Sequence, residues 1–373
     1  MQLKNKDNSI IVSSELKSMQ QAEFKKRVAL IDYIGACDHH GTPIGHQLKS
    51  LLDTEEIWSD DLQFEVIAPQ PYLERCKSEN KHRLPLRINN LKIGRNTYQN
   101  IKGMFICLIN IFIAFRKAKA DYMWFYNVNQ FLFVYLGLFG FGRKKIIVTI
   151  FTKEYPKKYH NYFLQKVLPN FHLVINSNLE CADRGTNNIY VPDYLYIENK
   201  YRAYKTASKE EKVICLGLMS QSKMIKELVL AFNEIDYPLE ICGLFYESEY
   251  YEEIVRIKKD HITVHNEYLD YKQYLEKLGR SKYCVFPYNA AAYKNNTSGI
   301  VLESIFLDVI PIGQQELMSK MEIPSIRYEE IGDLKSVDLW GESHEDLMVA
   351  NQKIVMERFA EGIYKDKLLA SIF

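Results

Sequence analysis

The sequence lacks the usual signs of a disulfide-bonded, metal-binding or membrane-spanning protein. Its seven cysteines are scattered without a CxxC pair, and no histidines cluster at metal-ligand spacing. An odd number of separated cysteines predicts reduced thiols in a cytosolic protein, most of them small core residues. No run reaches the roughly 18–20 apolar residues of a membrane span. The longest runs, Met104–Phe115 and Phe131–Gly142, therefore predict buried helices.

The beginning of the chain also lacks an apolar segment. Residues 1–26 are polar and charged, which predicts a polar extension and no signal peptide. Charged residues make up 25% of the chain and hydrophobic residues 47%, a balance that argues against disorder. With 373 residues, the chain has the length of two domains.

Short apolar runs alternate with amphipathic segments in the second half of the chain. Val213–Leu218 and Leu239–Phe245 are such runs, Lys282–Pro287 and Val309–Ile312 resemble them, and apolar residues at helical spacing separate the first two. Strands that alternate with helices imply right-handed crossovers and a parallel sheet. Ligands of open α/β sheets bind at the carboxyl edge of the strands, so we expect a binding site there.

The first half repeats this α/β pattern. The strands that it predicts are Val28–Ile34, Phe64–Pro69, Tyr122–Tyr126, Lys145–Ile150 and Leu173–Asn176. The helices that it predicts are Ile44–Leu52, Tyr98–Lys119, Gln130–Phe139 and Tyr159–Leu168. Tyr194–Glu211 is polar without apolar periodicity and predicts a connection between two domains, 27–207 and 208–345. A helix in 346–373 follows the second domain.

Residues suited to a nucleoside diphosphate lie at the predicted carboxyl edge of the second domain. Lys223 follows the first strand, and Thr297, Ser298 and Gly299 precede a predicted helix, whose N-terminal amides and dipole favour phosphate. Glu303 lies one to two turns further along, where a carboxylate accepts hydrogen bonds from paired ribose hydroxyls. Taken singly, the Thr-Ser-Gly turn reads as a helix cap and Glu303 as a solvated helix residue. Their combined placement favours a site.

Two motifs in this half resemble the donor domain of GT-B glycosyltransferases, specifically the retaining glycosyltransferase family 4. Residues 217–223 are similar to the family's glycine-to-lysine loop, whose lysine binds the donor pyrophosphate. Residues 287–303 are similar to its segment with paired glutamates, and Glu303 falls on the second, ribose-binding one. The donor-binding residues that the resemblance implies are Gly217, Ser220, Lys223, Pro287, Tyr288, Asn295, Asn296, Thr297, Ser298, Gly299 and Glu303.

The resemblance implies two Rossmann-like domains that face each other across a cleft, with the last helix packed back on the first domain. It also implies metal-independent transfer, more readily retaining than inverting, with no cofactor beyond the nucleotide-sugar donor. The sequence departs from the family at Asn295, where a glutamate contacts the donor sugar, and at Leu218, where an arginine is usual. Asn127 and Asn129 lie where many members carry a histidine.

A loop after the first strand predicts the acceptor side. Its two glycines, proline and titratable side chains resemble the glycine-rich acceptor loop of GT-B enzymes, and histidine is the common proton shuttle near neutral pH. A surface or structural role remains open for each histidine. The acceptor residues that we predict are Asp38, His39, His40, Gly41, Gly45, His46, Asn127 and Asn129. The catalytic residues would be Lys223, Asn295 and His46.

Charge divides unevenly along the chain. Residues 1–207 carry 29 Lys+Arg against 19 Asp+Glu, and the remainder carries 19 against 28. A basic half predicts an anionic partner, and an anionic membrane surface fits a transferase that extends lipid-linked glycans. Clusters at 116–119, 143–145 and 153–158 carry this charge, although scattered solvated charges would look the same. Nucleic acid is not expected, because no binding motif interleaves aromatics with the basic residues.

These observations predict a cytosolic, peripherally membrane-associated glycosyltransferase of surface polysaccharide synthesis. It would move a sugar from a nucleotide-diphosphate sugar to a glycan or lipid-linked glycan. Two alternatives stay open at this point. One is a nucleotide-sugar epimerase of the same fold, and the other is a non-catalytic GT-B partner in a glycan-assembly complex.

Overall fold

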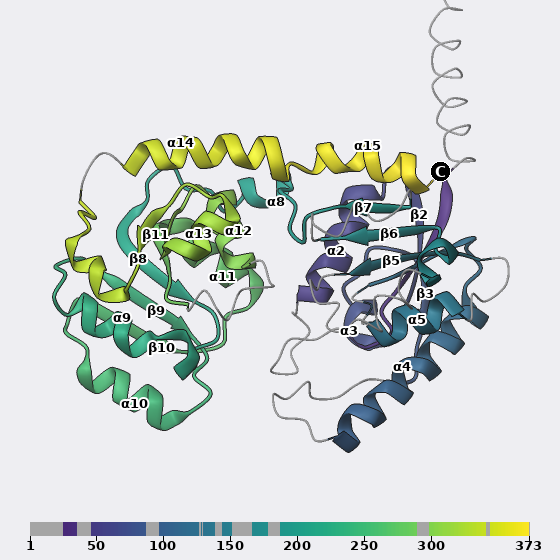
Figure 1. Cartoon of the computed structure of the whole chain (residues 1–373), viewed down its shortest axis with the longest axis horizontal. Coiled ribbons are helices and arrows are strands. Elements are labelled where there is room, and N and C mark those ends of the chain that lie inside the picture. Colours follow the sequence, from purple (N-terminus) through teal and green to yellow (C-terminus); the bar gives the residue numbers. More distant parts are fainter. Residues whose placement is uncertain are drawn as a thin grey trace, which may run out of the picture. The chain divides into compact units, whose positions relative to one another are not determined.

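The computed structural model describes residues 25–35, 46–86, 97–126, 128, 130–138, 144–150, 166–177, 187–288, 298–340 and 344–372. They divide into two compact units, of which unit 1 ends at Tyr190 and unit 2 begins at Val191. Ser371 and Ile372, near the end of the chain, group with unit 1. Figure 1 shows each unit as a sheet with helices packed on its faces. Within the described residues, no helix is long and apolar enough to cross a membrane.

Unit 1 contains a parallel sheet in the order β3-β2-β1-β4-β5-β6-β7. Its strands are β1 (Lys26–Ile31), β2 (Leu62–Ala68), β3 (Asn80–Arg83), β4 (Tyr122–Phe125), β5 (Lys145–Ile150), β6 (Leu173–Asn176) and β7 (Asn188–Tyr190). Its helices are α2 (His46–Trp58), α3 (Gln70–Leu73), α4 (Thr97–Lys117), α5 (Gln130–Leu138) and the short turn η1 (Leu168–Asn170). Side chains of α4 and α5 share one core with the sheet, so both helices pack on the same sheet face.

Unit 2 contains a parallel sheet in the order β10-β9-β8-β11-β12-β13. Its strands are β8 (Glu210–Leu216), β9 (Leu239–Gly243), β10 (Ile262–Asn266), β11 (Ser281–Phe286), β12 (Ile310–Gln314) and β13 (Ile326–Tyr328). Its helices and turns are α8 (Glu198–Arg202), η2 (Gln221–Lys223), α9 (Ile225–Phe232), α10 (Ser248–Ile257), α11 (Tyr271–Arg280), α12 (Gly299–Phe306), α13 (Gln315–Met321), η4 (Ile331–Ser336), α14 (Glu345–Ile354) and the π-helical turn η6 (Val355–Phe359). Helix α15 (Glu361–Ile372) ends the described chain.

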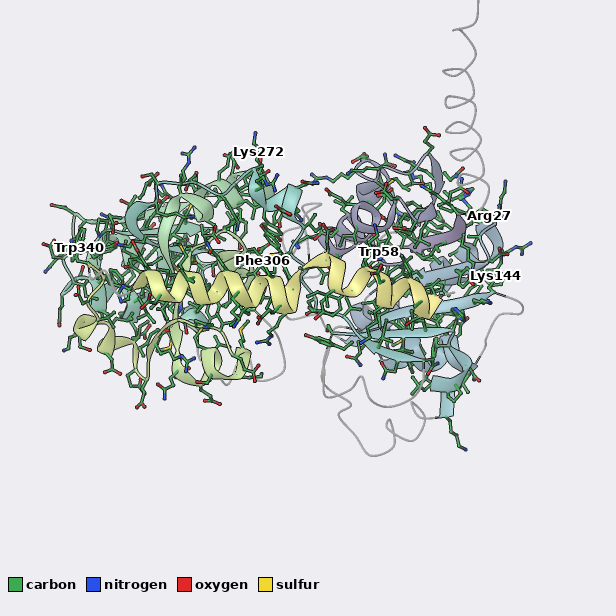
Figure 2. The ribbon with its side chains drawn as sticks, turned by 90° about the horizontal axis from the view of Figure 1, so that it is seen from above. Arg27, Trp58, Lys144, Lys272, Phe306 and Trp340 are labelled. Carbon is green, nitrogen blue, oxygen red and sulfur yellow. The ribbon has the colours of Figure 1, made fainter. Side chains whose placement is uncertain are left out.

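Two cores cover the two faces of the unit 2 sheet. One contains α9 and α10 with alternate strand residues such as Val213 and Ile241. The other contains α11 and α12 with Ile214 and Cys242, the neighbours of those residues along the strands. Because successive side chains of a strand point to opposite faces, this alternation shows that the sheet is buried on both sides. Figure 2 shows Phe306 within unit 2 and Trp340 at its periphery.

Tyr194–Glu211, the stretch expected to connect the domains, groups with unit 2 and contributes side chains to its core. Tyr196 and Tyr201 are buried in the unit 2 core, where both rings contact Phe306. Lys209 also contacts unit 2, because its ammonium donates hydrogen bonds to the carbonyls of Gly279, at 2.5 Å, and Leu307, at 2.7 Å. Burial lowers the pKa of Lys209 to about 8. The sequence did not predict these contacts, because tyrosine rings and the apolar stem of a lysine can be buried in a segment that has no periodic pattern of apolar residues.

The prediction that Met104–Phe115 and Phe131–Gly142 form buried helices is wrong for one side of each helix. Phe105 and Phe112 of α4 are 61% and 49% exposed, and Phe131 and Leu138 of α5 are also exposed. By contrast, all five cysteines within the described residues are buried, as predicted. They are Cys76, Cys107, Cys215, Cys242 and Cys284.

Candidate functional site

The carboxyl ends of β8 and β9 approach closely enough to require glycine. Gly217, after β8, has a φ of +111°, which favours glycine. A Cβ atom on Gly243, the last residue of β9, would lie 1.7 Å from the carbonyl oxygen of Gly217. Beyond this point Met219 pairs with Phe245, so the two chains continue side by side. The loop that carries Lys223 is therefore held against the end of β9.

Gly243→Ala should test this approach. The added methyl group must displace the backbone at Gly217, so we expect a loss of about 2–3 kcal/mol in the free energy of unfolding. Chemical denaturation would measure it. Gly332→Ala is the matched control, because no atom lies within 4 Å of its added Cβ. Equal stability of the two variants would contradict the close packing of this loop.

Lys223 lies between the ends of two strands. Its ammonium is 5.0 Å from the ring centroid of Tyr288, after β11, and a Cβ on Gly217 would lie 3.5 Å from the same nitrogen. The backbone N–H of Lys223 donates to the carbonyl of Ser220 at 3.0 Å, which closes the turn η2. Tyr288 is itself buried. The predicted residues Gly217, Ser220, Lys223 and Tyr288 are thus brought together, with buried Pro287 next to Tyr288.

The ammonium of Lys223 has no carboxylate partner among the described residues. Burial lowers its pKa, and a negative charge on Cys215 would oppose that effect. Burial also raises the pKa of Cys215 to about 12, so this thiol is neutral near pH 7. A partly buried cation without a carboxylate partner among the described residues is costly, and an anionic ligand lowers that cost. The loop therefore presents a positive charge suited to an anionic ligand.

Glu303 is not the solvated helix residue that the sequence left open. It is only 4% exposed, and its Oε1 and Oε2 accept hydrogen bonds from the hydroxyls of Tyr271, at 2.6 Å, and Tyr274, at 2.9 Å. The two rings stack on α11 with their planes 15° apart. Burial, followed by the nearby charge of Glu303, holds the pKa of Tyr274 well above its ordinary value. Both phenols therefore act as donors that fix the carboxylate.

The N-terminus of α12 differs in part from the expected cap. Ser298 occupies the N-cap position, but its side chain makes no capping hydrogen bond. A Cβ atom on Gly299 would lie 2.3 Å from the hydroxyl oxygen of Tyr194. The glycine is thus required by a neighbouring tyrosine, whereas we expected it to admit a phosphate. Whether a ligand also approaches this backbone stays a prediction.

The remaining predicted site residues cannot be placed. Ten predicted donor-binding or acceptor-binding residues lie outside the described part of the chain, namely Asp38, His39, His40, Gly41, Gly45, Asn127, Asn129, Asn295, Asn296 and Thr297. His46 begins α2, but its side chain also lies outside the described part. Among the described residues, no group of three or more His, Cys, Asp or Glu is arranged to hold a metal ion.

Sequence reasoning missed three tyrosines beside α12, namely Tyr194, Tyr271 and Tyr274. Tyr271 and Tyr274 are three residues apart on a helix, which reads as a core stripe. One signal for their helix was present, because Asp270 and Gln273 form a capping box at its start. Nothing in the sequence pairs this helix with Glu303.

Comparisons with known proteins support the fold. The structure is similar to that of HepE from Anabaena in complex with UDP, with a TM-score of 0.64 and 11% sequence identity. The similarity covers 93% of this chain and 99% of the HepE chain. It is also similar to sucrose-phosphate synthase from Thermosynechococcus elongatus, over 92% and 97% of the chains, with a TM-score of 0.61 and 13% identity. A putative UDP-N-acetylglucosamine 2-epimerase from Listeria monocytogenes matches over 93% and 96%, with a TM-score of 0.59 and 14% identity. No protein-family model matches the sequence, and neither does any curated protein.

These similarities and the two parallel sheets confirm the GT-B fold predicted from the sequence. At identities of 11–14% they establish the fold alone.

Proposed function

We propose that the chain is a glycosyltransferase that moves a sugar from a nucleotide-diphosphate sugar to a glycan or lipid-linked glycan. The observation that carries the proposal is the ammonium of Lys223, which lies at the carboxyl edge of a parallel sheet without a carboxylate partner among the described residues. A departing diphosphate is the anion that such a charge would stabilise, and electrostatic stabilisation commonly dominates group transfer. The GT-B fold and the UDP in the HepE structure are consistent with this ligand.

In the proposed reaction, the bond between the anomeric carbon and the diphosphate oxygen breaks as the acceptor oxygen bonds to that carbon. Lys223 and the amides at residues 297–299 would stabilise the charge left on the diphosphate. Asn295 would contact the donor sugar. His46, in the acceptor set with Asp38 and its neighbours, would take the acceptor proton. We propose that transfer is metal-independent and retaining, as in family 4, so the acceptor oxygen would bond to the face of the anomeric carbon that the diphosphate leaves.

Glu303 would hold the ribose. The hydroxyls of Tyr271 and Tyr274 each donate to one oxygen of this carboxylate. A carboxylate oriented in this way suits the paired hydroxyls of a ribose, which both donate hydrogen bonds. The tyrosines then orient the carboxylate before the ligand arrives, which reduces the entropy that binding costs.

We further propose a place for the protein at the cytoplasmic face of the cell membrane, in surface polysaccharide synthesis. The excess of basic residues in the first 207 residues supports attraction to an anionic leaflet. A transferase acting on a lipid-linked acceptor would gain by this location, because donor and acceptor then meet at the bilayer surface.

Product analysis tests the function against its alternatives. The protein is incubated with a panel of nucleotide sugars after thermal-shift screening of the nucleoside diphosphates. Slow release of free nucleoside diphosphate supports a transferase, because water replaces the acceptor. Inversion of the sugar without release indicates an epimerase. Absence of both, for a protein that binds nucleotide, indicates a non-catalytic partner.

Asn295→Ala should separate the sugar from the nucleotide. Because its proposed contact is with the donor sugar, we expect unchanged affinity for bare nucleoside diphosphate. Affinity for the nucleotide sugar should fall about fivefold to tenfold, the value of one hydrogen bond. Calorimetry with both ligands measures the two affinities. An equal loss for both would assign Asn295 to the diphosphate.

A further inference from the structure

Helix α4 presents an apolar face to solvent. Ile101, Phe105, Ile109 and Phe112 recur at the spacing of one helix face, and their side chains are 46% to 61% exposed. The opposite face, with Cys107, Ile111 and Ala114, packs in the core of unit 1. Four large apolar side chains in a row on the solvent side are unusual for a helix of a soluble domain, because such a face is normally polar.

The orientation of this helix is fixed by a buried polar anchor. The side-chain amide of Asn110 donates at 2.8 Å to the carbonyls of Tyr33 and Leu86, on segments that flank other strands of the sheet. At its C-terminal end, Lys117 donates to the carbonyl of Arg83 at 2.8 Å. The helix therefore cannot turn its apolar face inward without breaking these hydrogen bonds.

The part of the sequence that contains α4 is strongly basic. Between residues 80 and 153 the sequence holds 13 Lys+Arg and a single acidic residue, Asp121. On α4 itself, Lys102 near the beginning and Arg116 and Lys117 at the end are exposed. The guanidinium of Arg116 lies 5.7 Å from the ring centroid of Phe112, so cationic and apolar groups adjoin.

We propose that the exposed face of α4 docks on an anionic lipid surface. Its four apolar side chains enter the boundary between headgroups and acyl chains, while Lys102 and Arg116 contact the headgroups. This deepens the membrane attachment in the proposed function by naming the surface that binds, and it does not depend on glycosyl transfer.

Charge favours lipid over a second copy of the chain. A symmetric dimer across α4 would bring the basic ends of two copies of the helix together, and like charges across an interface oppose association. An anionic bilayer instead supplies the opposite charge and an apolar phase at the depth that the side chains reach. The affinity for vesicles should then have two contributions. Salt screens the electrostatic contribution and does not weaken the apolar one.

Vesicle sedimentation tests the two parts separately. Phe105→Ser with Phe112→Ser should lower affinity for phosphatidylglycerol–phosphatidylcholine vesicles by roughly ten- to thirtyfold, and remove the binding that persists in high salt. Lys102→Gln with Arg116→Gln should lower affinity by about tenfold in low salt and by little in high salt. Val349→Ser with Met356→Ser is the matched control, because these unit 2 residues are 61% and 57% exposed.

A second readout covers the possibility that the double serine variant misfolds. In Phe105→Trp, fluorescence should be quenched by brominated acyl chains, whereas the fluorescence of Val349→Trp should be indifferent to them. Unchanged affinity in the serine variant, or no additional quenching in Phe105→Trp relative to Val349→Trp, overturns the proposal. So does a parent protein that dimerises in solution through α4 and binds no vesicles.

Nucleotide binding is measured independently in the same samples. The parent and the serine variant should show the same thermal shift with UDP, one of the nucleoside diphosphates in the panel. If neither binds any nucleoside diphosphate while vesicle binding follows the expected pattern, the proposed function fails and the lipid surface stands.

Discussion

Lys223→Met should weaken nucleoside diphosphate binding by about one to two powers of ten and make the ligand-free protein more stable. The loss follows from removing a charge-assisted contact worth roughly 1.5–3 kcal/mol. The gain follows because methionine keeps most of the apolar stem and removes a partly buried charge that has no carboxylate partner among the described residues. We expect about 1 kcal/mol in the free energy of unfolding. Calorimetry and urea denaturation measure the two effects.

The pH dependence of the parent protein, compared with that of Lys223→Met, provides a second test. The pKa of Lys223 is lowered in the folded protein, so above that pKa the unfolded chain binds a proton that the folded chain has lost. The stability of the ligand-free parent should therefore rise with pH between the lowered pKa and about 10.4, the ordinary value for lysine. Nucleotide affinity should fall over the same window, because the diphosphate needs the protonated form.

Lys209 contributes a slope of the same sign, since its pKa is about 8 in the folded protein. The difference between parent and Lys223→Met isolates the part due to Lys223. Lys226→Met is the control for general charge, because this exposed lysine one turn away pairs with Glu253. If Lys223→Met binds nucleotide as tightly as the parent, the donor site lies elsewhere.

Glu303→Gln should remove the preference for ribose. If the carboxylate accepts from paired hydroxyls, the parent should bind ribonucleoside diphosphates about ten- to a hundredfold more tightly than their 2′- or 3′-deoxy analogues. In Glu303→Gln both ligands should bind with similar, lower affinity. The substitution also leaves one tyrosine donor facing an amide N–H, so a loss of about 1–3 kcal/mol in stability is expected whatever the function.

The ratio between ribose and deoxyribose ligands therefore decides the role of Glu303, because a purely structural loss would not change it. Tyr271→Phe keeps the carboxylate and removes one of its donors, and its affinity for nucleotide should change only a few-fold. A ratio that stays at the parent's value in Glu303→Gln would show that Glu303 serves only to tie α12 to α11 through its tyrosines.

The central strands of both sheets could be predicted from the sequence, and the edge strands could not. Lys145–Ile150 and Leu173–Asn176 were predicted with the bounds that the structure gives. The strand β3 was missed because its sequence, Asn-Lys-His-Arg, has no apolar face, and β10 keeps only its first residue buried. An edge strand is held by backbone hydrogen bonds on one side, so its side chains carry little pattern.

The candidate site shows the same division. The loop from Gly217 to Lys223 could be predicted because local chemistry, a glycine turn and a lysine after a strand, defines it. The partners of Glu303 could not, because Tyr271 and Tyr274 reach it from another helix, about 30 residues away in sequence. The exposed face of α4 was also missed, since a long apolar helix reads as buried whichever side it presents.

The strand order of unit 2 has a consequence for the newly made chain. Strand β8 lies at the centre of its sheet, between β9 and β11, yet β11 begins roughly 65 residues after β8 ends. At about 5–20 residues per second, a ribosome leaves one side of β8 unpaired for roughly 3–13 seconds. Throughout that interval an apolar strand with free N–H and C=O groups can pair with any neighbouring nascent chain. Slow stretches of translation before Ser281 would lengthen that exposure, and a chaperone that covers β8 would shorten it.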